Sequence, residues 1–294
     1  MSERHPIIAI TGSSGAGTTS VTRTFENIFR REGVMSAVIE GDSFHRYERN
    51  EMKRRQAEAE KAGNRNFSHF GPENNLFAEL EELFHCYGES GTGKRRKYLH
   101  NAEEAAPYKQ EPGTFTPWED VPQNTDLLFY EGLHGALVTP EVNVACHPDL
   151  LIGVVPVINL EWVQKLWRDK KQRGYSTEAV TDTILRRMPD YVNYICPQFT
   201  HTHVNFQRVP MVDTSNPFVA RDIPAPDESL VVIRFANPKG IDFQYLMSMA
   251  HDSFMSRANT IVVPGGKMEL AMQLIFTPFI WRMMERRKAA LSAL

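Results

Sequence analysis

The sequence predicts an α/β protein built on a mixed, mostly parallel sheet flanked by helices. Three observations lead to this prediction: short apolar runs typical of buried strands recur, amphipathic helical stretches follow several of them, and a glycine-rich loop joins the first strand to the first helix. The 294 residues can bury a sizeable core, and 41% of them are hydrophobic. We expect a single domain over residues 1–294, with insertions at about 45–122 that form a substrate or lid region.

The first strand and the loop after it organise the rest of the chain. Ile7–Ile10 is an apolar, β-favouring run, and apolar residues at helical spacing begin at Val21. Between them lies a loop whose backbone N–H groups, together with a helix N-terminus, can cradle phosphates. We therefore expect nucleotide phosphates to bind along this loop. The residues concerned are Gly12, Ser13, Ser14, Gly15, Ala16, Gly17, Thr18 and Thr19.

The loop departs from the P-loop pattern at one position. Gly12, Gly17 and Thr19 match G-x-x-x-x-G-K-[ST], but Thr18 stands where the lysine belongs. That lysine would face the β- and γ-phosphates, and a charge pair at about 4 Å is worth about 4 kcal/mol at an effective dielectric of about 20. Either another cation supplies this charge or the loop does not support phosphoryl transfer. A glycine-rich turn without a ligand is the alternative.

Composition excludes several classes of protein. The formal charge of −3 argues against a general nucleic-acid binder, although the basic run Lys94–Lys97 could neutralise a small anionic substrate. No stretch of about 18 apolar residues predicts a membrane span, and the N-terminus lacks a signal-peptide core. Cys86, Cys146 and Cys196 are widely spaced, which disfavours a disulfide framework or a zinc site. We expect a cytoplasmic protein.

A second strand, Ser36–Glu40, places Asp42 at a carboxyl end. Ligands of open α/β sheets bind outside those ends, so Asp42 and the glycine-rich loop should face one cleft. If a helix begins there, Asp42, His45 and Arg49 share one face and could handle a hydroxyl and a phosphate together. The alternative is that Asp42 only caps that helix.

The stretch from about 45 to 122 carries the expected insertions. Glu48–Ala62 is a charged helical stretch, and Gly63–Asn75 is a polar loop that could be a mobile lid. A further helix begins at Leu76. The chain from Lys97 to Pro122 is irregular.

The strand Asp126–Gly132 ends in an acid. P-loop proteins hold Mg²⁺ at that place, so Glu131 is the candidate metal ligand.

The strand Leu150–Val157 follows, and then a helix that could supply the positive charge of the missing lysine. Its two sides differ: Leu160, Val163 and Trp167 are apolar, whereas Lys165, Arg168 and Asp169 are charged. Lys165 or Arg168 could supply the charge that Thr18 lacks, and a salt-bridged exposed face is the alternative.

The remaining elements complete the α/β pattern. The helix carrying Lys165 ends at Arg173–Gly174, and the pattern predicts another helix over Thr177–Met188. Short β-like pieces and a terminal helix to about Lys288 follow. The β-like pieces are Val204–Val209, Leu230–Arg234 and Thr260–Val263.

Four motifs together resemble the bacterial phosphoribulokinases, members of the P-loop uridine kinase/phosphoribulokinase superfamily. The resemblance covers essentially the whole chain, and the bacterial family also lacks the P-loop lysine. It implies a P-loop kinase fold like that of the nucleoside-monophosphate kinases. The motifs are Gly12–Thr19, Glu40–Arg46, Phe129–Gly135 and Asn159–Lys165.

The resemblance implies ATP-dependent phosphorylation of D-ribulose 5-phosphate at the C1 hydroxyl, giving ribulose 1,5-bisphosphate and ADP in the Calvin cycle. It implies Asp42 as the base, Lys165 as the group that stabilises the transferring phosphoryl and Asp169 as a second acid. Which of the two carboxylates takes the proton stays open. The other roles implied are sugar-phosphate binding by His45, Arg49, Arg168 and Arg173, and Mg²⁺ binding by Glu131 and Thr19.

The resemblance also implies regulation and assembly. Bacterial members are octamers activated by NADH and inhibited by AMP, so we expect a homo-oligomer with NADH as activator. The residues expected in the allosteric apparatus are Arg31, Arg187, Arg234 and Arg257. Two other functions stay open: a uridine- or pantothenate-type kinase of the same superfamily, and a non-catalytic module that senses adenylate.

Overall fold

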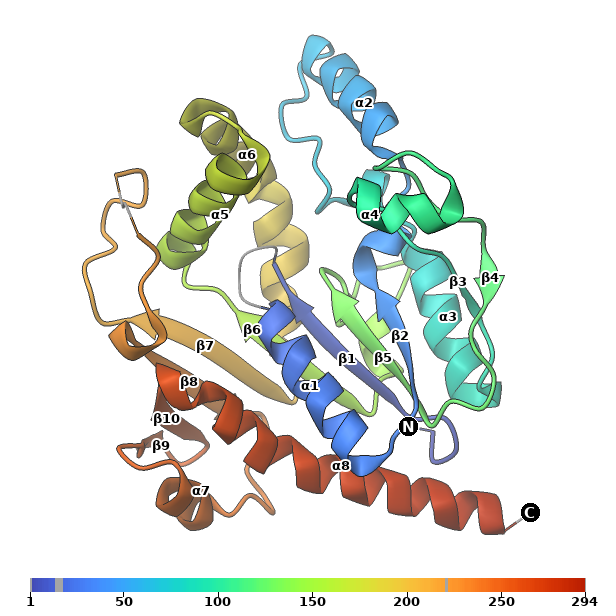
Figure 1. Cartoon of the computed structure of the whole chain (residues 1–294), viewed down its shortest axis with the longest axis vertical. Coiled ribbons are helices and arrows are strands. Elements are labelled where there is room, and N and C mark those ends of the chain that lie inside the picture. The colour runs from blue at the N-terminus through green and yellow to red at the C-terminus, as the bar shows by residue number, and fades with distance from the viewer. Residues whose placement is uncertain (1, 14–17, 220–221, 294) are drawn as a thin grey trace.

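The computed structural model describes residues 2–13, 18–219 and 222–293, and Figure 1 shows one main sheet with helices against it. In these residues the main sheet has eight strands in the spatial order β2-β5-β1-β6-β7-β8-β10-β9. The first five run parallel, and β8, β10 and β9 pair in antiparallel fashion. The mostly parallel α/β sheet is thus confirmed. Its strands are β1 (Ile7–Gly12), β2 (Ser36–Glu40), β5 (Leu127–Gly132), β6 (Leu150–Val155), β7 (Val204–Pro210), β8 (Ser229–Phe235), β9 (Phe254–Arg257) and β10 (Thr260–Pro264).

Helices connect most of the strands. A separate two-stranded sheet, β3 (Lys94–Arg95) and β4 (Glu119–Asp120), lies within the predicted insertion. Within the described residues, no helix combines the length and the apolar character needed to cross a bilayer. The helices are α1 (Thr18–Glu32), α2 (Arg49–Lys61), α3 (Phe77–Ser90), α4 (Ala102–Ala105), α5 (Ile158–Arg173), α6 (Thr177–Asp190), α7 (Phe243–Met249) and α8 (Met268–Ser292).

Both faces of β1 are buried, which explains its uninterrupted apolar sequence. Successive side chains of a strand point to opposite faces, so Ile8 joins one core cluster and Ile7 the other. Ile8 shares its cluster with α1 and α8, where the rings of Phe25 and Phe276 lie 4.9 Å apart. Ile7 shares the other cluster with Phe84 of α3. The sheet is therefore a rigid support for the loops at its carboxyl edge.

The direction of the chain changes between β1 and β6. From β1 the chain returns to the sheet at β2, on one side, and from β6 it returns at β7, on the other. Ligand crevices of open α/β sheets form at such a switch point. The loop after β1 and helix α5 after β6 both begin there, and Figure 1 shows α5 and α6 rising above this edge of the sheet. The fold thus explains why α5 can complete a site that begins in the loop.

The helix considered at Asp42 does not form, and this interpretation was wrong. The chain makes a 3₁₀ turn over Gly41–Phe44, becomes extended at His45 and starts α2 only at Arg49. The guanidinium of Arg96 donates to the backbone carbonyls of Ser43, at 2.8 Å, and His45, at 2.6 Å. These two carbonyls accept hydrogen bonds from a side chain and not from the backbone of a helix that continues past the turn. Asp42 does not cap a helix either, because the cap residues are Glu40 for the turn and Glu48 for α2.

Further details of the prediction need correction. Leu160 and Val163 are buried as expected, but Trp167 is 37% exposed. Lys165 and Asp169, on the charged side of α5, are also buried, so that side is not a salt-bridged exposed face. The terminal helix continues to Ser292, and the sequence did not reveal α7 or β9.

Candidate active site

The carboxyl ends of β2 and β5 bring two predicted carboxylates to neighbouring positions. Asp42 lies in the turn directly after β2, and Glu131 is the penultimate residue of β5, which pairs in parallel with β2. A Cβ atom on Gly41 would lie 2.7 Å from the Cα of Gly132, so the two backbones approach as closely as glycine alone permits. Glycine at both positions therefore lets the turn bearing Asp42 pack against the end of β5.

Asp42 is held by two imidazoles. Nε2 of His45 lies 3.2 Å from Oδ1, and Nε2 of His100 lies 3.7 Å from Oδ2. Desolvation would raise the pKa of Asp42, but the charge of His45 and its hydrogen bond, with smaller contributions from His100 and His69, hold it well below its ordinary range. The Asp42 side chain remains 42% exposed. It is therefore an ionised carboxylate that a substrate hydroxyl can reach.

On α5, Lys165 and Asp169 form a buried ion pair. Nζ of Lys165 lies 2.5 Å from Oδ2 of Asp169, and both side chains are less than a tenth exposed. Nε of Arg168 lies 3.6 Å from the other carboxylate oxygen. Burial, and then the charge of Arg187, lower the pKa of Lys165 to about 8, against the opposing influence of Asp169. The spacing of four residues that the sequence suggested thus places cation and carboxylate together.

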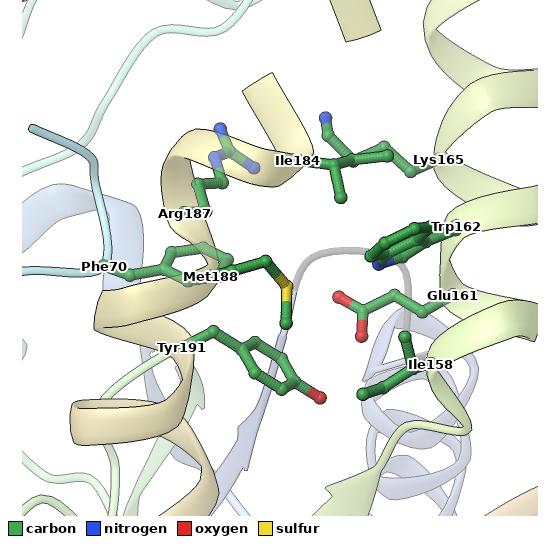
Figure 2. Close-up of a pocket in the computed structure, with 9 residues that line it drawn as sticks. All are labelled: Phe70, Ile158, Glu161, Trp162, Lys165, Ile184, Arg187, Met188 and Tyr191. Carbon is green, nitrogen blue, oxygen red and sulfur yellow. The ribbon is translucent and has the colours of Figure 1, made fainter. Parts of the chain in front are cut away.

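A pocket between α5 and α6 contains groups that the sequence did not single out (Figure 2). The Oγ of Ser13 donates a hydrogen bond to Oε1 of Glu161, so the start of the glycine-rich loop is joined to α5. Tyr191 also bonds to Glu161, and burial raises the pKa of the Glu161 carboxyl despite these contacts. Glu161 lies four residues before Lys165, on the same side of the helix. That spacing was the signal that could have identified it.

Arg187, expected in the allosteric apparatus, lies in this same pocket with Lys165 (Figure 2). Its guanidinium carbon is 5.0 Å from the centre of the Phe70 ring. Burial is the main reason that the pKa of Arg187 is lowered, and the charge of Asp169 opposes that effect. Arg187 therefore contributes positive charge to the cleft itself.

The pKa of His69 is affected both by groups near Asp42 and by groups of the pocket between α5 and α6. Burial lowers its pKa well below the ordinary value, and the charges of His45 and Arg187 lower it further. Asp42 raises it, and Lys165 lowers it slightly more. Groups from the β2 turn, α5 and α6 thus act on one imidazole. Contacts also join the base candidate to the cation candidate, because the His69 ring lies 4.8 Å from that of His45, and Phe70, the next residue, lines the pocket that contains Lys165.

Two arginines of the insertion lie near the Asp42 turn, and one of them contacts it. Arg49 donates to the carbonyl of His100 at 2.7 Å, beside Tyr98, so it lies at the rim near Asp42. Arg96, besides its two bonds to the turn, lies 3.7 Å from the Phe115 ring centre. The basic run at 94–97 is thus not simply a solvated face, because one of its members is turned inward.

Several predicted residues lie outside what the structure describes. Gly12 ends β1 and Ser13 is buried, but Ser14, Gly15, Ala16 and Gly17 lie outside the described residues. Thr18 and Thr19 belong to α1, and Arg173 ends α5; the described side chains include none of these three.

The carboxyl end of β5 offers carboxylates of the kind that bind Mg²⁺, although the described residues include no group of three or more such ligands. Glu131 pairs in register with Glu40 of β2, and the Asp42 turn lies beside them. Carboxylate oxygens suit this hard cation, which proteins commonly bind through one or two carboxylates while substrate phosphates provide further ligands. Glu131 remains the candidate ligand.

The other predicted allosteric arginines lie on other elements. Arg31, near the end of α1, donates to Oγ1 of Thr277 on α8 at 2.8 Å. Arg234 of β8 and Arg257 of β9 both pair in register with Thr260 of β10, which lies between those strands. The structure thus brings Arg234 and Arg257 into one row across the antiparallel end of the sheet.

A family model described as the phosphoribulokinase / uridine kinase family matches residues 7–215. The chain belongs to this family. The chain is 83% identical over 290 residues to a protein of Cupriavidus necator named "Phosphoribulokinase, plasmid", with 99% of both chains covered. It is 68% identical to a phosphoribulokinase of Nitrobacter vulgaris, covering 99% of this chain and 100% of the relative.

A solved family structure is also similar to this chain. The phosphoribulokinase from Rhodobacter spheroides matches with a TM-score of 0.90 and 58% identity, covering 98% of this chain and 100% of that one. The P-loop kinase fold and the family predicted from the sequence are confirmed, and with them the prediction of an ATP-dependent kinase.

Proposed function

We propose that this family member transfers the γ-phosphoryl group of ATP to the C1 hydroxyl of D-ribulose 5-phosphate, giving ribulose 1,5-bisphosphate, ADP and a proton. The observation that carries the proposal is the series of contacts that leads from the reachable Asp42 carboxylate through His45 to His69, and from the adjacent Phe70 into the pocket that contains Lys165. The similarity to phosphoribulokinases over 99% of the chain supports the choice of acceptor.

The proposed mechanism assigns one task to each group. Asp42 accepts the proton of the C1 hydroxyl as the new O–P bond forms and the bond to the β-phosphate oxygen breaks. Lys165 neutralises charge that develops on the transferred group, which is what a loose phosphoryl-transfer transition state requires. Asp169 keeps Lys165 in place, because the two are paired at 2.5 Å.

Binding falls to other residues. We assign the sugar phosphate to His45, Arg49, Arg168 and Arg173, and the ATP phosphates to the glycine-rich loop from Gly12 to Thr19. Glu131 and Thr19 would hold Mg²⁺, which neutralises phosphate charge when bound. Arg187 adds positive charge to the same pocket.

The test is ADP release by the purified protein with Mg²⁺-ATP and ribulose 5-phosphate, beside uridine and pantothenate as acceptors. We expect turnover with ribulose 5-phosphate and none with uridine or pantothenate. Turnover only with another acceptor would support a kinase activity but assign it a different substrate. No turnover with any acceptor would favour the adenylate-sensing module.

The proposal also covers regulation by effectors, the oligomeric state, and the cellular location and pathway of the protein. NADH would activate and AMP inhibit a cytoplasmic homo-octamer that serves the Calvin cycle. Arg31, Arg234 and Arg257 are assigned to the allosteric apparatus, whereas the place of Arg187 beside Lys165 would couple effector binding to the cleft. Rates with and without NADH, and the mass of the assembly by light scattering, test these assignments. An unchanged rate at saturating NADH would exclude NADH activation.

A further inference from the structure

The side-chain amide of Asn75 has a fixed orientation. Asn75 is only 2% exposed and follows the 3₁₀ turn Pro72–Asn74. Its Nδ2 donates to two backbone carbonyls, that of His69 at 2.9 Å and that of Gly71 at 2.7 Å. Both amide hydrogens are thereby used, so the opposite orientation would set an oxygen against two carbonyl oxygens. The amide oxygen must therefore be the atom that faces His45.

That orientation determines one proton of His45. Oδ1 of Asn75 lies 2.9 Å from Nδ1 of His45, and an amide oxygen can only accept a hydrogen bond. Nδ1 of His45 must consequently carry hydrogen. A neutral imidazole with hydrogen on Nδ1 would then present the lone pair of Nε2 to its other neighbour.

The other neighbour is the Asp42 carboxylate, with Oδ1 3.2 Å from Nε2 of His45. A lone pair facing a carboxylate is repulsive, so this contact also needs a proton. Because the Asp42 side chain is 42% exposed and lies near His100 as well, the proton is more stable on the imidazole than on the carboxylate. His45 thus carries hydrogen on both ring nitrogens and is a cation.

Most of the remaining groups around His45 are neutral, and the exceptions are the guanidiniums of Arg96, which donates to the His45 carbonyl, and Arg187. Burial lowers the pKa of both His69, whose ring centre lies 4.8 Å away, and His134, so both are neutral neighbours. Tyr98 lies 6.5 Å away with a raised pKa, chiefly because it is buried, and Arg187 is the opposing cation. Burial and Arg187 would lower the pKa of His45, but the bonds to Asp42 and Asn75 raise it above its ordinary value.

We propose that Asn75 is a positioning residue that locks His45 in its doubly protonated form, so that a cation is ready for the sugar phosphate before the substrate binds. The backbone of residues 69–71 holds the amide, the amide holds the Nδ1 proton, and Asp42 holds the Nε2 proton. The polar loop that the sequence marked as a possible lid therefore controls the charge of a substrate-binding residue. The role of the cation rests on the proposed function, whereas the lock itself does not.

The variant Asn75→Leu removes the lock with little change in side-chain size. Asn74→Ala is the matched control, because the Asn74 amide donates to the carbonyl of Ser68 in the same loop at 2.5 Å but forms no hydrogen bond to His45. Any general loosening of the loop should affect both variants. Only a change at the imidazole should be specific to Asn75.

The first measurement is the titration of the His45 ring by NMR in the protein without substrate, with His45→Gln used to assign its signals. We expect a midpoint above 6.5 in the wild type and in Asn74→Ala, and a midpoint lower by about one unit in Asn75→Leu. A wild-type midpoint at or below 6.5, or equal midpoints in the wild type and Asn75→Leu, would overturn the proposal. This readout does not require turnover, so it stands even if ribulose 5-phosphate is not the substrate.

The second measurement is a double-mutant cycle on KM for ribulose 5-phosphate, at a pH between the two NMR midpoints. Asn75→Leu should raise KM by about threefold when His45 is present, because a midpoint lowered by about one unit leaves about a third as much imidazolium midway between the two midpoints, and hardly at all when His45 is replaced by glutamine. A purely structural role of Asn75 would raise KM equally in both backgrounds, and that result would refute its action through His45.

Discussion

Nζ of Lys165 lies 2.5 Å from Oδ2 of Asp169, one turn further along α5, in a buried ion pair at the edge of the cleft. A buried lysine without such a partner would lose its proton readily, and Asp169 opposes that loss. The pair therefore supplies from α5 the cation that Thr18 does not supply in the glycine-rich loop. It also makes the activity of the protein depend on pH.

The value of kcat/KM for ATP should fall about tenfold per pH unit above a pH of about 8, because burial and the charge of Arg187 lower the pKa of Lys165 to about 8. The ammonium form is present below that pH and is lost as the pH rises through it. The measurement is a pH profile at saturating sugar phosphate, where His45 is already occupied. Lys165→Arg, which keeps its charge, should lack this alkaline decline. A decline that persists in Lys165→Arg would assign it to another group.

Asp42→Asn should lower kcat by about 10²–10⁴-fold, because the amide cannot take the proton of the acceptor hydroxyl. ATP affinity, measured by calorimetry, should change little, since Asp42 lies on the β2 turn and not in the glycine-rich loop. Near-normal turnover in this variant would show that Asp42 is not the base and would leave Asp169 as the candidate. A loss of ATP binding would point to a misplaced turn instead.

The hydrogen bond between Ser13 and Glu161 should set the position of the glycine-rich loop relative to α5. Ser13→Ala and Glu161→Ala should each raise KM for ATP by about tenfold or more, in line with about 1.5–3 kcal/mol for a hydrogen bond to a charged group. The double variant should be hardly worse than either single one, because both remove the same contact. Fully additive effects would show that the two side chains act separately.

Gly132→Ala should destabilise the fold by about 1–3 kcal/mol, because the added Cβ would lie 2.6 Å from the Cα of Gly41 and from the hydroxyl of Tyr130. The control is Gly88→Ala in α3, where nothing lies closer than 3.9 Å. That change should stabilise by about 0.5–1 kcal/mol. Urea unfolding measures both free energies. Equal stability of the two variants would contradict the close packing of the Asp42 turn against β5.

The fold and half of the site follow from local sequence patterns. Apolar runs reveal the parallel strands, and helical spacing places Lys165 and Asp169 together, because both signals lie within one element. The turn at Asp42 could not be predicted in this way. Its shape depends on Arg96, which reaches it from more than fifty residues along the chain.

The groups that the sequence did not reveal act across loops. His100 meets Asp42, and Asn75 meets His45, through long-range packing that no spacing rule encodes. Arg187 is a further example, because its position in the sequence of α6 did not indicate that it would line the same pocket as Lys165. Side chains that belong to different elements require the tertiary structure before they can be assigned to one site.

The most direct test of the central claim is the identity of the product formed from Mg²⁺-ATP and ribulose 5-phosphate, determined by phosphorus NMR. We expect one ADP for each new phosphate ester at C1, with the original ester at C5 retained, and no such ester with Asp42→Asn over the same time. A phosphate at another hydroxyl, or ADP formed without any new ester, would contradict transfer to a C1 hydroxyl activated by Asp42.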